Sequence, residues 1–342
     1  MDVLIRNENG IGRITLNRPQ ALHALNTDMC RLMSEALTEW AVDDRVTLLM
    51  IDHAEGTRGF CAGGNIRMVA ESGRKDGKAG EDFFRIEYTL NTQIKRFPKP
   101  YVALLDGVTM GGGVGISIHG SHRIATEHTL FAMPETGIGL FPDVGGSWFL
   151  PRLEGQLGTW LALTGARLKG RDVLAADIAT HFIASEKLPE AKARILGGEA
   201  PETVLADYAE APQTPAYAEH LDIINHCFSR PTITDICLAL KMADNVWATA
   251  QADILKTRSP LSMAVSLAQL RRGAQMSSFE DIMRMEYRIA CHIIRTHDFS
   301  EGVRAVIEDK DHAPKWSPET PAGVSQNQVE AMFAPVAEEL SL

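Results

Sequence analysis

The stretch YVALLDGVTMGGGVG, residues 101–115, sets a nearly all-apolar run directly against a glycine-rich turn. The run 101–106 is typical of a short strand that is buried on both faces. The glycines that follow it lead into an expected helix. VTLLMID (46–52) and the loop EGTRGFCAGGN repeat this order. Strand, glycine loop and helix alternate over the first ~180 residues, which predicts an α/β (α+β) fold with functional loops at the strand ends.

Local signals mark several other elements of the chain. Asn9-Gly10, between VLIR and GRITLN, predicts a β-hairpin, and Asn26 is expected to cap a helix. Further along, a helix is predicted to begin after the cap Ser259 and to stop at Gly273. Another helix is predicted over 280–295.

The pattern of the chain changes after the alternating part. Residues 186–310 are rich in helix formers and lack strand-like runs. We therefore predict a core over 1–185 that carries the site, and a helical C-terminal region over 186–342 that packs on or near the site.

Composition excludes several classes of protein. Apolar residues make up 45 % of the 342, which allows a sizeable core and argues against disorder. The net charge is −10, and no run of Lys and Arg forms the basic stripe of a nucleic-acid surface. No apolar run reaches the roughly 18 residues of a membrane span, and the N-terminal stretch lacks a signal-peptide pattern. We expect neither a nucleic-acid nor a membrane partner.

The cysteines and histidines point to neither disulfides nor a metal. There are five cysteines, an odd number, and no CxxC pair, which favours a reducing compartment and a cytoplasmic location. Cys61 lacks an evident histidine partner in the sequence, so we expect a packed side chain rather than a nucleophile. His119 and His122 lack a third ligand in the sequence, so no metal site is predicted.

The two glycine loops could supply backbone N–H groups to a ligand. Each loop opens an expected helix, whose first N–H groups are unpaired, and glycine lets a substrate approach them closely. Two N–H groups aimed at one oxygen would stabilise the oxyanion that forms when a carbonyl is attacked. The alternative for either loop is close packing of helix on strand. A phosphate-binding loop is disfavoured, because no Lys-Ser/Thr follows the glycines and the spaced GxGxxG pattern is absent.

The stretch MPETGIGLFPDVGG (133–146) places two acids, Glu135 and Asp143, in an apolar and sharply turning segment. Burying a charge there is expensive, which favours a functional reason for both acids. The alternative is that one acid caps a helix while the other packs against an arginine. The residues alone leave these two interpretations equal.

Three segments together resemble a known superfamily. They are FCAGGNIRMVAE (60–71), PYVALLDGVTMGGGVGISIHG (100–120) and FAMPETGIGLFPDVGGSWFLPRL (131–153). They resemble the crotonase, or enoyl-CoA hydratase/isomerase, superfamily, and within it most closely the 3-hydroxyisobutyryl-CoA hydrolase branch. The resemblance extends over most of the chain, including NRPQALHALN (17–26), RLKGRDVLAADIATHFI (167–183) and HDFSEGVRAVIEDKDHAPKW (297–316), and is least marked over 186–255.

The resemblance implies a fold and a set of site residues. The fold would be a crotonase-type spiral of ββα units followed by a helical C-terminal region. A thioester carbonyl would sit between the backbone amides of Gly64 and Gly112. The substrate would also contact the neighbouring residues of both loops, an acid that matches a pocket acid of the branch, and an arginine near a CoA phosphate. These substrate-binding residues are Ala62, Gly63, Gly111, Glu87 and Arg67, although for Arg67 an ordinary surface position is the alternative.

The resemblance also separates hydrolysis from hydration. Hydratases of the superfamily use two glutamates, and this sequence has Gly115 in place of the first, while Glu135 matches the second. Asp143 is the acid that the hydrolase branch adds. The implied activity is hydrolysis of an acyl-CoA, as in valine breakdown, with Glu135 acting as nucleophile or as general base. No cofactor is implied beyond the CoA of the substrate, and a homo-oligomer is compatible with the sequence. The alternatives are an enoyl-CoA isomerase or hydratase and a non-catalytic acyl-CoA-binding protein.

Overall fold

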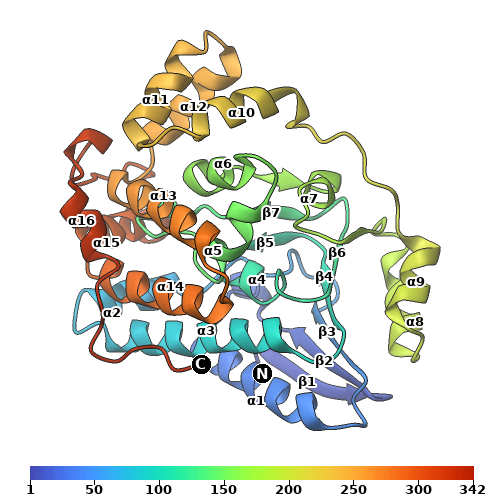
Figure 1. Cartoon of the computed structure of the whole chain (residues 1–342). Coiled ribbons are helices and arrows are strands. Elements are labelled where there is room, and N and C mark those ends of the chain that lie inside the picture. The colour runs from blue at the N-terminus through green and yellow to red at the C-terminus, as the bar shows by residue number, and fades with distance from the viewer. The chain divides into compact units, whose positions relative to one another are not determined.

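The computed structural model describes all 342 residues (Figure 1). Their packing defines two compact units. Each unit is built from separate stretches of the chain. The first unit comprises Met1–Gly64, Thr89–Phe131 and Arg167–Ala216, and the second comprises Asn65–Tyr88, Ala132–Ala166 and Tyr217–Leu342. These units are divisions by packing, so the domain boundary that we place near residue 185 stays a prediction. No helix is both long enough and apolar enough to span a bilayer.

A six-stranded sheet forms the centre of the first unit. In spatial order its strands are β1 (Val3–Glu8), β2 (Ile11–Leu16), β3 (Leu48–His53), β4 (Tyr101–Leu105), β6 (His122–Ala125) and β9 (His181–Phe182). The first pair is antiparallel and the others are parallel. The hairpin is confirmed, because Asn9 and Gly10 both adopt the positive φ that its tight turn requires. A smaller sheet has the order β5 (Val108–Met110), β7 (Leu130–Ala132) and β8 (Leu168–Lys169).

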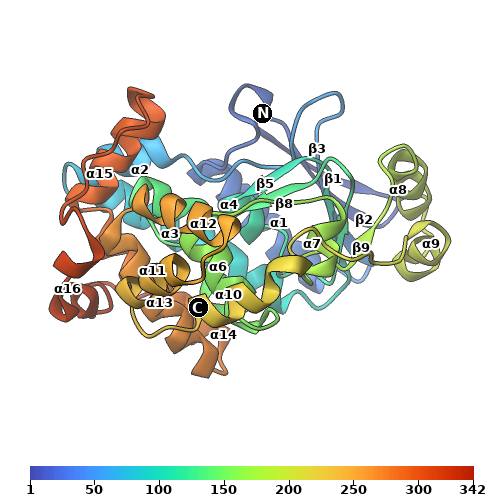
Figure 2. The ribbon, with the colours of Figure 1, turned by 90° about the horizontal axis from the view of Figure 1, so that it is seen from above.

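Helices cover the large sheet within the first unit. Asn26 caps α1 (Thr27–Val42) as predicted, because its Oδ1 accepts a 2.9 Å hydrogen bond from the Met29 N–H. Helices α8 (Leu188–Leu196) and α9 (Pro201–Tyr208) lie side by side at the sheet (Figure 2). They bury one apolar core with the strands: Ile11, Leu48, Met50, Val102, Leu104, Ile124, Ile183, Leu188, Ala191, Ile195, Val204 and Leu205. Burial of these apolar side chains is the main contribution to the stability of the sheet face that they cover.

Most of the remaining helices belong to the second unit. The short helices of the first unit are α4 (Gly112–Gly115) and α7 (Arg171–Ala175), and α3 (Lys78–Arg96) runs from the second unit into the first. No strand follows β9. The second unit contains α2 (Ile66–Gly73), α5 (Gly146–Phe149), α6 (Leu157–Thr164), α10 (Leu221–Phe228), α11 (Ile233–Met242), α12 (Val246–Lys256), α13 (Pro260–Gln275), α14 (Phe279–Ile293), α15 (His297–Val303) and α16 (Gln326–Ala331).

Helix α13 confirms one predicted boundary and corrects the other. The Ser259 Oγ accepts from the Ser262 N–H at 3.1 Å and caps the helix, as predicted. The predicted stop at Gly273 is wrong, because the helix continues to Gln275. A Cβ at position 273 would lie 2.0 Å from the carbonyl oxygen of Ser147. Glycine is therefore needed here for close packing of α13 on α5, and not to end the helix.

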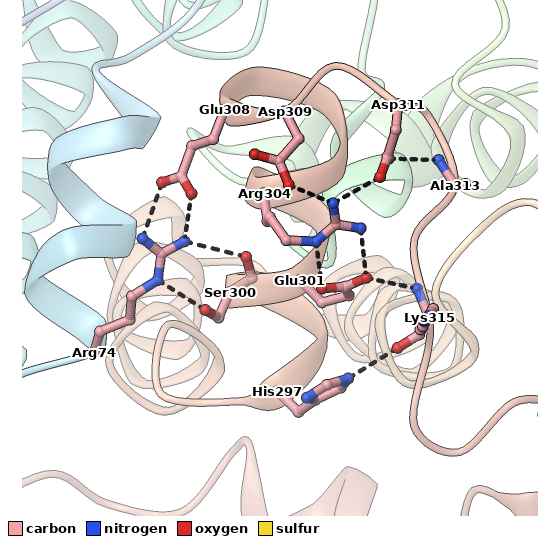
Figure 3. Close-up of polar contacts among 10 residues, drawn as sticks. All are labelled: Arg74, His297, Ser300, Glu301, Arg304, Glu308, Asp309, Asp311, Ala313 and Lys315. Atoms are coloured by element: carbon pink, nitrogen blue, oxygen red, sulfur yellow. Dashed lines mark hydrogen bonds and ion pairs between the residues drawn. The ribbon is translucent and has the colours of Figure 1, made fainter.

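An arginine-centred network holds the segment after α15 (Figure 3). The Arg304 guanidinium bonds both carboxylate oxygens of Glu301 at 2.8 Å, and it reaches Asp309 and Asp311 at 2.7 Å each. Hydrogen bonds from Arg304 lower the pKa of Glu301 to about 2. Arg74, which follows α2 directly, pairs with Glu308 in the same way, at 2.9 and 3.1 Å. A network of this kind fixes a loop geometry, although each exposed pair alone adds only about 0–1 kcal/mol.

Candidate active site

The second unit carries both acids of the segment 133–146. Glu135 begins a short 3-10 helix, Glu135–Ile138, which ends at Gly139. Gly139 has a φ of +73°, and a Cβ there would lie 2.2 Å from the carbonyl oxygen of Asp298. Only glycine fits this approach, so the turn after Glu135 depends on it. The Glu135 residue is 5 % exposed, and its Oε2 has no hydrogen-bond partner within the protein.

Asp143 lies in the same unit and has a defined partner. The hydroxyl of Tyr88, on α3, donates a 2.9 Å hydrogen bond to Asp143 Oδ2, and both side chains are buried. Glu87 precedes Tyr88 on that helix and is buried too, with no hydrogen-bond partner for its Oε1. The second unit therefore buries all three predicted acids, Glu87, Glu135 and Asp143. The charge of Asp143 acts on the carboxyl groups of Glu87 and Glu135.

Burial perturbs the ionisation of all three acids, because leaving water destabilises a charged carboxylate. Burial raises the pKa of Glu135 and of Glu87 well above the ordinary value, and the charge of Asp143 adds to both shifts. Burial raises the pKa of Asp143 to about 7, while the hydrogen bond from Tyr88 opposes the rise. Carboxyl groups coupled in this way titrate as a group rather than singly. Perturbed acids in a cluster are typical of catalytic sites.

These contacts do not fit the non-functional interpretation of the two acids. Asp143 accepts its hydrogen bond from a tyrosine and not from an arginine. The 3-10 helix that begins at Glu135 has no side-chain cap. The pair resembles neither a helix cap nor an ordinary ion pair.

A fourth buried acid, Glu286, completes the cluster, and we did not predict it. Glu286 lies on α14 and is fully buried. Its Oε2 accepts a 2.8 Å hydrogen bond from the Gly145 N–H, and its Oε1 accepts one of 2.8 Å from the Ser147 N–H. Burial raises the pKa of Glu286 to about 8, the two N–H donors oppose the rise, and the charge of Asp143 adds to it. One sequence signal could have found it, because Glu286 stands on the apolar stripe of α14 at helical spacing from Phe279, Ile282, Met283, Ile289, Ala290 and Ile293.

The backbone just after Asp143 is strained. Val144 has a φ of +52° and Gly145 a φ of +87°, so two consecutive residues adopt the left-handed region. For a β-branched residue such as Val144 this conformation is rare and costs roughly 1–3 kcal/mol. Contacts with the surrounding residues must hold Val144 in this conformation. Backbone strain of this kind is common at functional sites.

The two glycine loops lie side by side in the first unit. The Cys61 N–H donates to the Val108 carbonyl at 2.8 Å, and the Met110 N–H donates to the Cys61 carbonyl at 3.0 Å. A Cβ at Gly113 would lie 2.3 Å from the Cys61 carbonyl oxygen, so glycine is needed for this approach. Close packing, the alternative to ligand binding that we considered for these loops, therefore applies to Gly113. This packing brings the two loops together.

The predicted oxyanion residues occupy the tips of these loops. An ideal Cβ on Gly63, which precedes Gly64, would lie 4.0 Å from the backbone nitrogen of Gly112. The N–H groups of Gly64 and Gly112 donate to no acceptor within the protein. Unpaired N–H groups on neighbouring loops are what an oxyanion site needs. Gly64 and Gly112 belong to the first unit, whereas Glu87, Glu135 and Asp143 belong to the second.

The other predicted substrate-binding residues have structural partners of their own. The Ala62 N–H donates to the Leu22 carbonyl at 3.0 Å, and the Gly63 carbonyl accepts from the Leu25 N–H at 2.7 Å. Gly111 precedes α4 with a φ of +47°. Arg67 is exposed, and its guanidinium donates to the Ile307 carbonyl at 3.3 Å. A role for these four residues in binding substrate stays a prediction.

Chemically, the two units offer different capabilities. The first offers N–H donors for a developing oxyanion, and the second offers carboxyl groups that can act as nucleophile, base or hydrogen-bond donor. No three His, Cys, Asp or Glu side chains are grouped so that they could hold a metal ion. The Cys61 thiol is buried and donates to the His23 carbonyl at 3.2 Å, which fits the packed side chain that we predict.

Comparison with known proteins gives consistent results. Residues 11–333 match the sequence model of the enoyl-CoA hydratase/isomerase family. The chain is 46 % identical over 345 residues to the mitochondrial 3-hydroxyisobutyryl-CoA hydrolase of Gallus gallus, covering 98 % of this chain and 89 % of that one. It is 46 % identical over 327 residues to the mitochondrial enzyme of that name from Homo sapiens, covering 93 % and 84 %.

Two solved structures also match closely. A carnitinyl-CoA dehydratase from Mycobacterium thermoresistibile has a TM-score of 0.95 at 41 % identity, covering 99 % of this chain and 98 % of that one. An enoyl-CoA hydratase from Rhodobacter sphaeroides 2.4.1 has a TM-score of 0.92 at 38 % identity, covering 100 % of both chains.

Proposed function

The chain belongs to the enoyl-CoA hydratase/isomerase family, and within that family we propose that it hydrolyses 3-hydroxyisobutyryl-CoA to 3-hydroxyisobutyrate and CoA. The predicted crotonase-type α/β fold is confirmed by the likeness to solved structures of the family. The substrate is proposed from relatives of that name at 46 % identity over nearly the whole chain. A place in valine breakdown is implied by that substrate and is part of the proposal.

One observation in the molecule carries the proposal of hydrolysis. Asp143 and Glu135 are both buried, and the charge of Asp143 raises the pKa of Glu135. The resemblance to the superfamily adds that Gly115 stands where hydratases have their first glutamate. Hydration as the superfamily performs it needs both of its own glutamates. A pair made of Glu135 and Asp143 fits water attack on a thioester instead.

We assign the chemical roles as follows. The N–H groups of Gly64 and Gly112 stabilise the negative charge that develops on the thioester oxygen. Glu135 attacks the carbonyl carbon or removes a proton from the water that attacks it. In the first route CoA leaves as the thiolate and water then opens the mixed anhydride; in the second, CoA leaves directly. Both routes consume one water and yield the same acid and CoA thiol.

Asp143 and Glu87 have supporting roles in this scheme. Asp143 holds the water or the 3-hydroxyl of the substrate, and the hydrogen bond from Tyr88 keeps its carboxylate oriented. Burial favours the neutral acid form of Glu87, because it raises the pKa of that carboxyl. A neutral acid can donate a hydrogen bond to a substrate hydroxyl.

A hydratase or isomerase activity is the second candidate, since the two solved relatives named above are a dehydratase and a hydratase. A panel of short acyl-CoAs separates the candidates when free thiol and enoyl absorbance are followed together. We expect thiol release from 3-hydroxyisobutyryl-CoA with no change in enoyl absorbance. A change in absorbance without thiol release would overturn hydrolysis, and binding without either change would indicate a non-catalytic protein.

The compartment is a separate proposal. All five cysteines are free, which is compatible with a reducing environment and with the cytoplasm that we predict. The relatives named above are mitochondrial, so they do not support a cytoplasmic location. Cell fractionation with antibody detection decides between the two compartments.

A further inference from the structure

Glu286 is a buried carboxyl group that no step of the proposed reaction uses. It lies on α14, far along the chain from the segment 133–146, and it is fully buried. Both of its oxygens are engaged by backbone N–H groups, those of Gly145 and Ser147, at 2.8 Å each. A carboxylate used entirely for two backbone bonds in a protein interior needs a reason, because the same turn could be capped by a smaller neutral group.

The position of the two hydrogen bonds to Glu286 explains why a buried carboxyl group is used here. They fall two and four positions after Asp143, on the turn in which Val144 and Gly145 adopt positive φ. On the other side of Asp143, the Gln269 Nε2 donates to the Pro142 carbonyl at 2.7 Å. The backbone that presents Asp143 is therefore held from α13 on one side and from α14 on the other.

The side chain of Asp143 depends on this backbone. Its Oδ2 accepts the 2.9 Å hydrogen bond from Tyr88, which is anchored on α3. If the turn at 144–147 relaxed, the carboxylate would shift relative to the hydroxyl of Tyr88, which is fully buried on the 19-residue helix α3. A displacement of about 1 Å in a catalytic group can lower the rate roughly 100-fold.

We infer that Glu286 is the positioning residue for Asp143: its two backbone hydrogen bonds hold the strained turn that aims the Asp143 carboxylate. The inference rests on the proposed function only in taking Asp143 as a catalytic acid. Glu286 itself touches neither substrate nor reacting atoms in this scheme. Its two N–H donors require two acceptor oxygens, which a carboxyl group offers and an amide does not.

Two variants remove the same contact from opposite ends. Glu286→Gln keeps the size of the side chain but turns one acceptor into an N–H donor that faces another N–H. Ser147→Pro removes one of the two N–H donors and keeps the charge of Glu286, and proline is tolerated in a first helical turn. The matched control is Glu301→Gln, which removes a carboxylate that also accepts a backbone N–H, from Lys315 at 2.9 Å, in the network of Figure 3.

We expect both test variants to lower kcat at least tenfold while KM for the acyl-CoA changes less than about twofold (tenfold is ~1.4 kcal/mol). The control is expected to lower thermal stability without changing kcat. Equal kcat in wild type and in either folded test variant would overturn the inference, as would a loss confined to KM. Loss of the fold in both variants, judged by circular dichroism, would also overturn it, since the bonds would then hold the chain and not the acid.

A second readout does not depend on turnover. The groups that face Asp143 are Glu87 and Tyr88 on α3, Glu135 on its 3-10 helix, and Glu286 on α14. In Ser147→Pro all these groups remain, so an upward shift in the ¹³C-carboxyl titration of Asp143 reports a weakened bond to Tyr88. An unchanged titration would count against the inference. If the wild type hydrolyses no acyl-CoA, the proposed function fails, while this titration still decides the role of Glu286.

Discussion

The hydroxyl of Tyr88 donates a 2.9 Å hydrogen bond to Oδ2 of Asp143, and both groups are buried. This bond lowers the pKa of Asp143 more than the backbone hydrogen bond that also lowers it, and both act against the larger effect of burial. It therefore increases the fraction of Asp143 that is ionised near neutral pH. Tyr88 itself stays a hydrogen-bond donor throughout, because burial raises the pKa of its hydroxyl well above the ordinary value.

Replacing Tyr88 by Phe is expected to raise the pKa of Asp143. A hydrogen bond to a charged group contributes about 1.5–3 kcal/mol, which corresponds to roughly one pKa unit or more. The reaction uses the ionised carboxylates, so kcat/KM of the wild type should rise with pH through about 7, and the midpoint for Tyr88→Phe should lie at higher pH. The measurement is a pH profile of kcat/KM for both proteins. Superimposed profiles would show that the Tyr88 bond does not tune the acid.

Buried Asp143 is expected to lower the free energy of unfolding at those pH values at which it is ionised. The folded-state pKa of Asp143 is about 7, against 3.8 for the free group, so its contribution to the free energy of unfolding is lost as pH rises from about 4 through 7. Asp143→Asn removes this loss, so the stability of the variant relative to the wild type should rise by about 3 kcal/mol between pH 5 and pH 8, because about two pH units separate pH 5 from the pKa of about 7, at 1.36 kcal/mol per unit. Denaturant unfolding at both pH values measures it. A relative stability that does not rise between the two pH values would contradict the expectation.

The same Asp143→Asn protein should hydrolyse its substrate poorly but still bind it. Binding is expected to stay within about tenfold of the wild type, equivalent to ~1.4 kcal/mol. Calorimetric titration with the acyl-CoA measures affinity, and single-turnover thiol release measures the chemical step. Loss of binding with an intact chemical step would reassign Asp143 to holding substrate.

Replacing Gly112 by Pro is expected to abolish turnover, because proline removes the N–H that faces the oxyanion. The fold should survive, since that N–H donates to no group within the protein. Circular dichroism checks the fold, and thiol release checks the activity. Gly113→Ala serves as a contrast: its Cβ would lie 2.3 Å from the Cys61 carbonyl, so this variant should disturb the loop itself. Normal turnover in folded Gly112→Pro would remove the oxyanion assignment.

Glu135 is expected to act as the nucleophile. Its Oε2 is buried without a hydrogen-bond partner, and a carboxylate stripped of water attacks a carbonyl more readily. A single turnover in ¹⁸O-water with enzyme in excess tests this. Label in Glu135, or a hydroxylamine adduct there, is positive proof of the anhydride, whereas label in the product alone fits both routes. If neither label nor adduct is found at Glu135 with any acyl-CoA, general-base catalysis is the better account.

The sequence by itself determined those features that depend on neighbouring residues. Asn9-Gly10 specified the hairpin, and Asn26 and Ser259 specified helix starts, because a turn or a cap is built within a few positions. The apolar runs predicted the central strands to within a few residues. The stretch 133–146 identified both acids of the candidate site, because charges in an apolar, turning segment conflict with burial unless they have a use.

Only the tertiary structure decided which groups those acids meet. Tyr88 and Asp143 are 55 positions apart, and Glu286 and Gly145 are 141 apart, so no local pattern contains either contact. Gly273 looked like the end of a helix and is instead a point of close packing on Ser147. The pKa of a carboxyl group depends on burial and on charges brought near it by folding, and these are properties of the assembled chain and not of the residue.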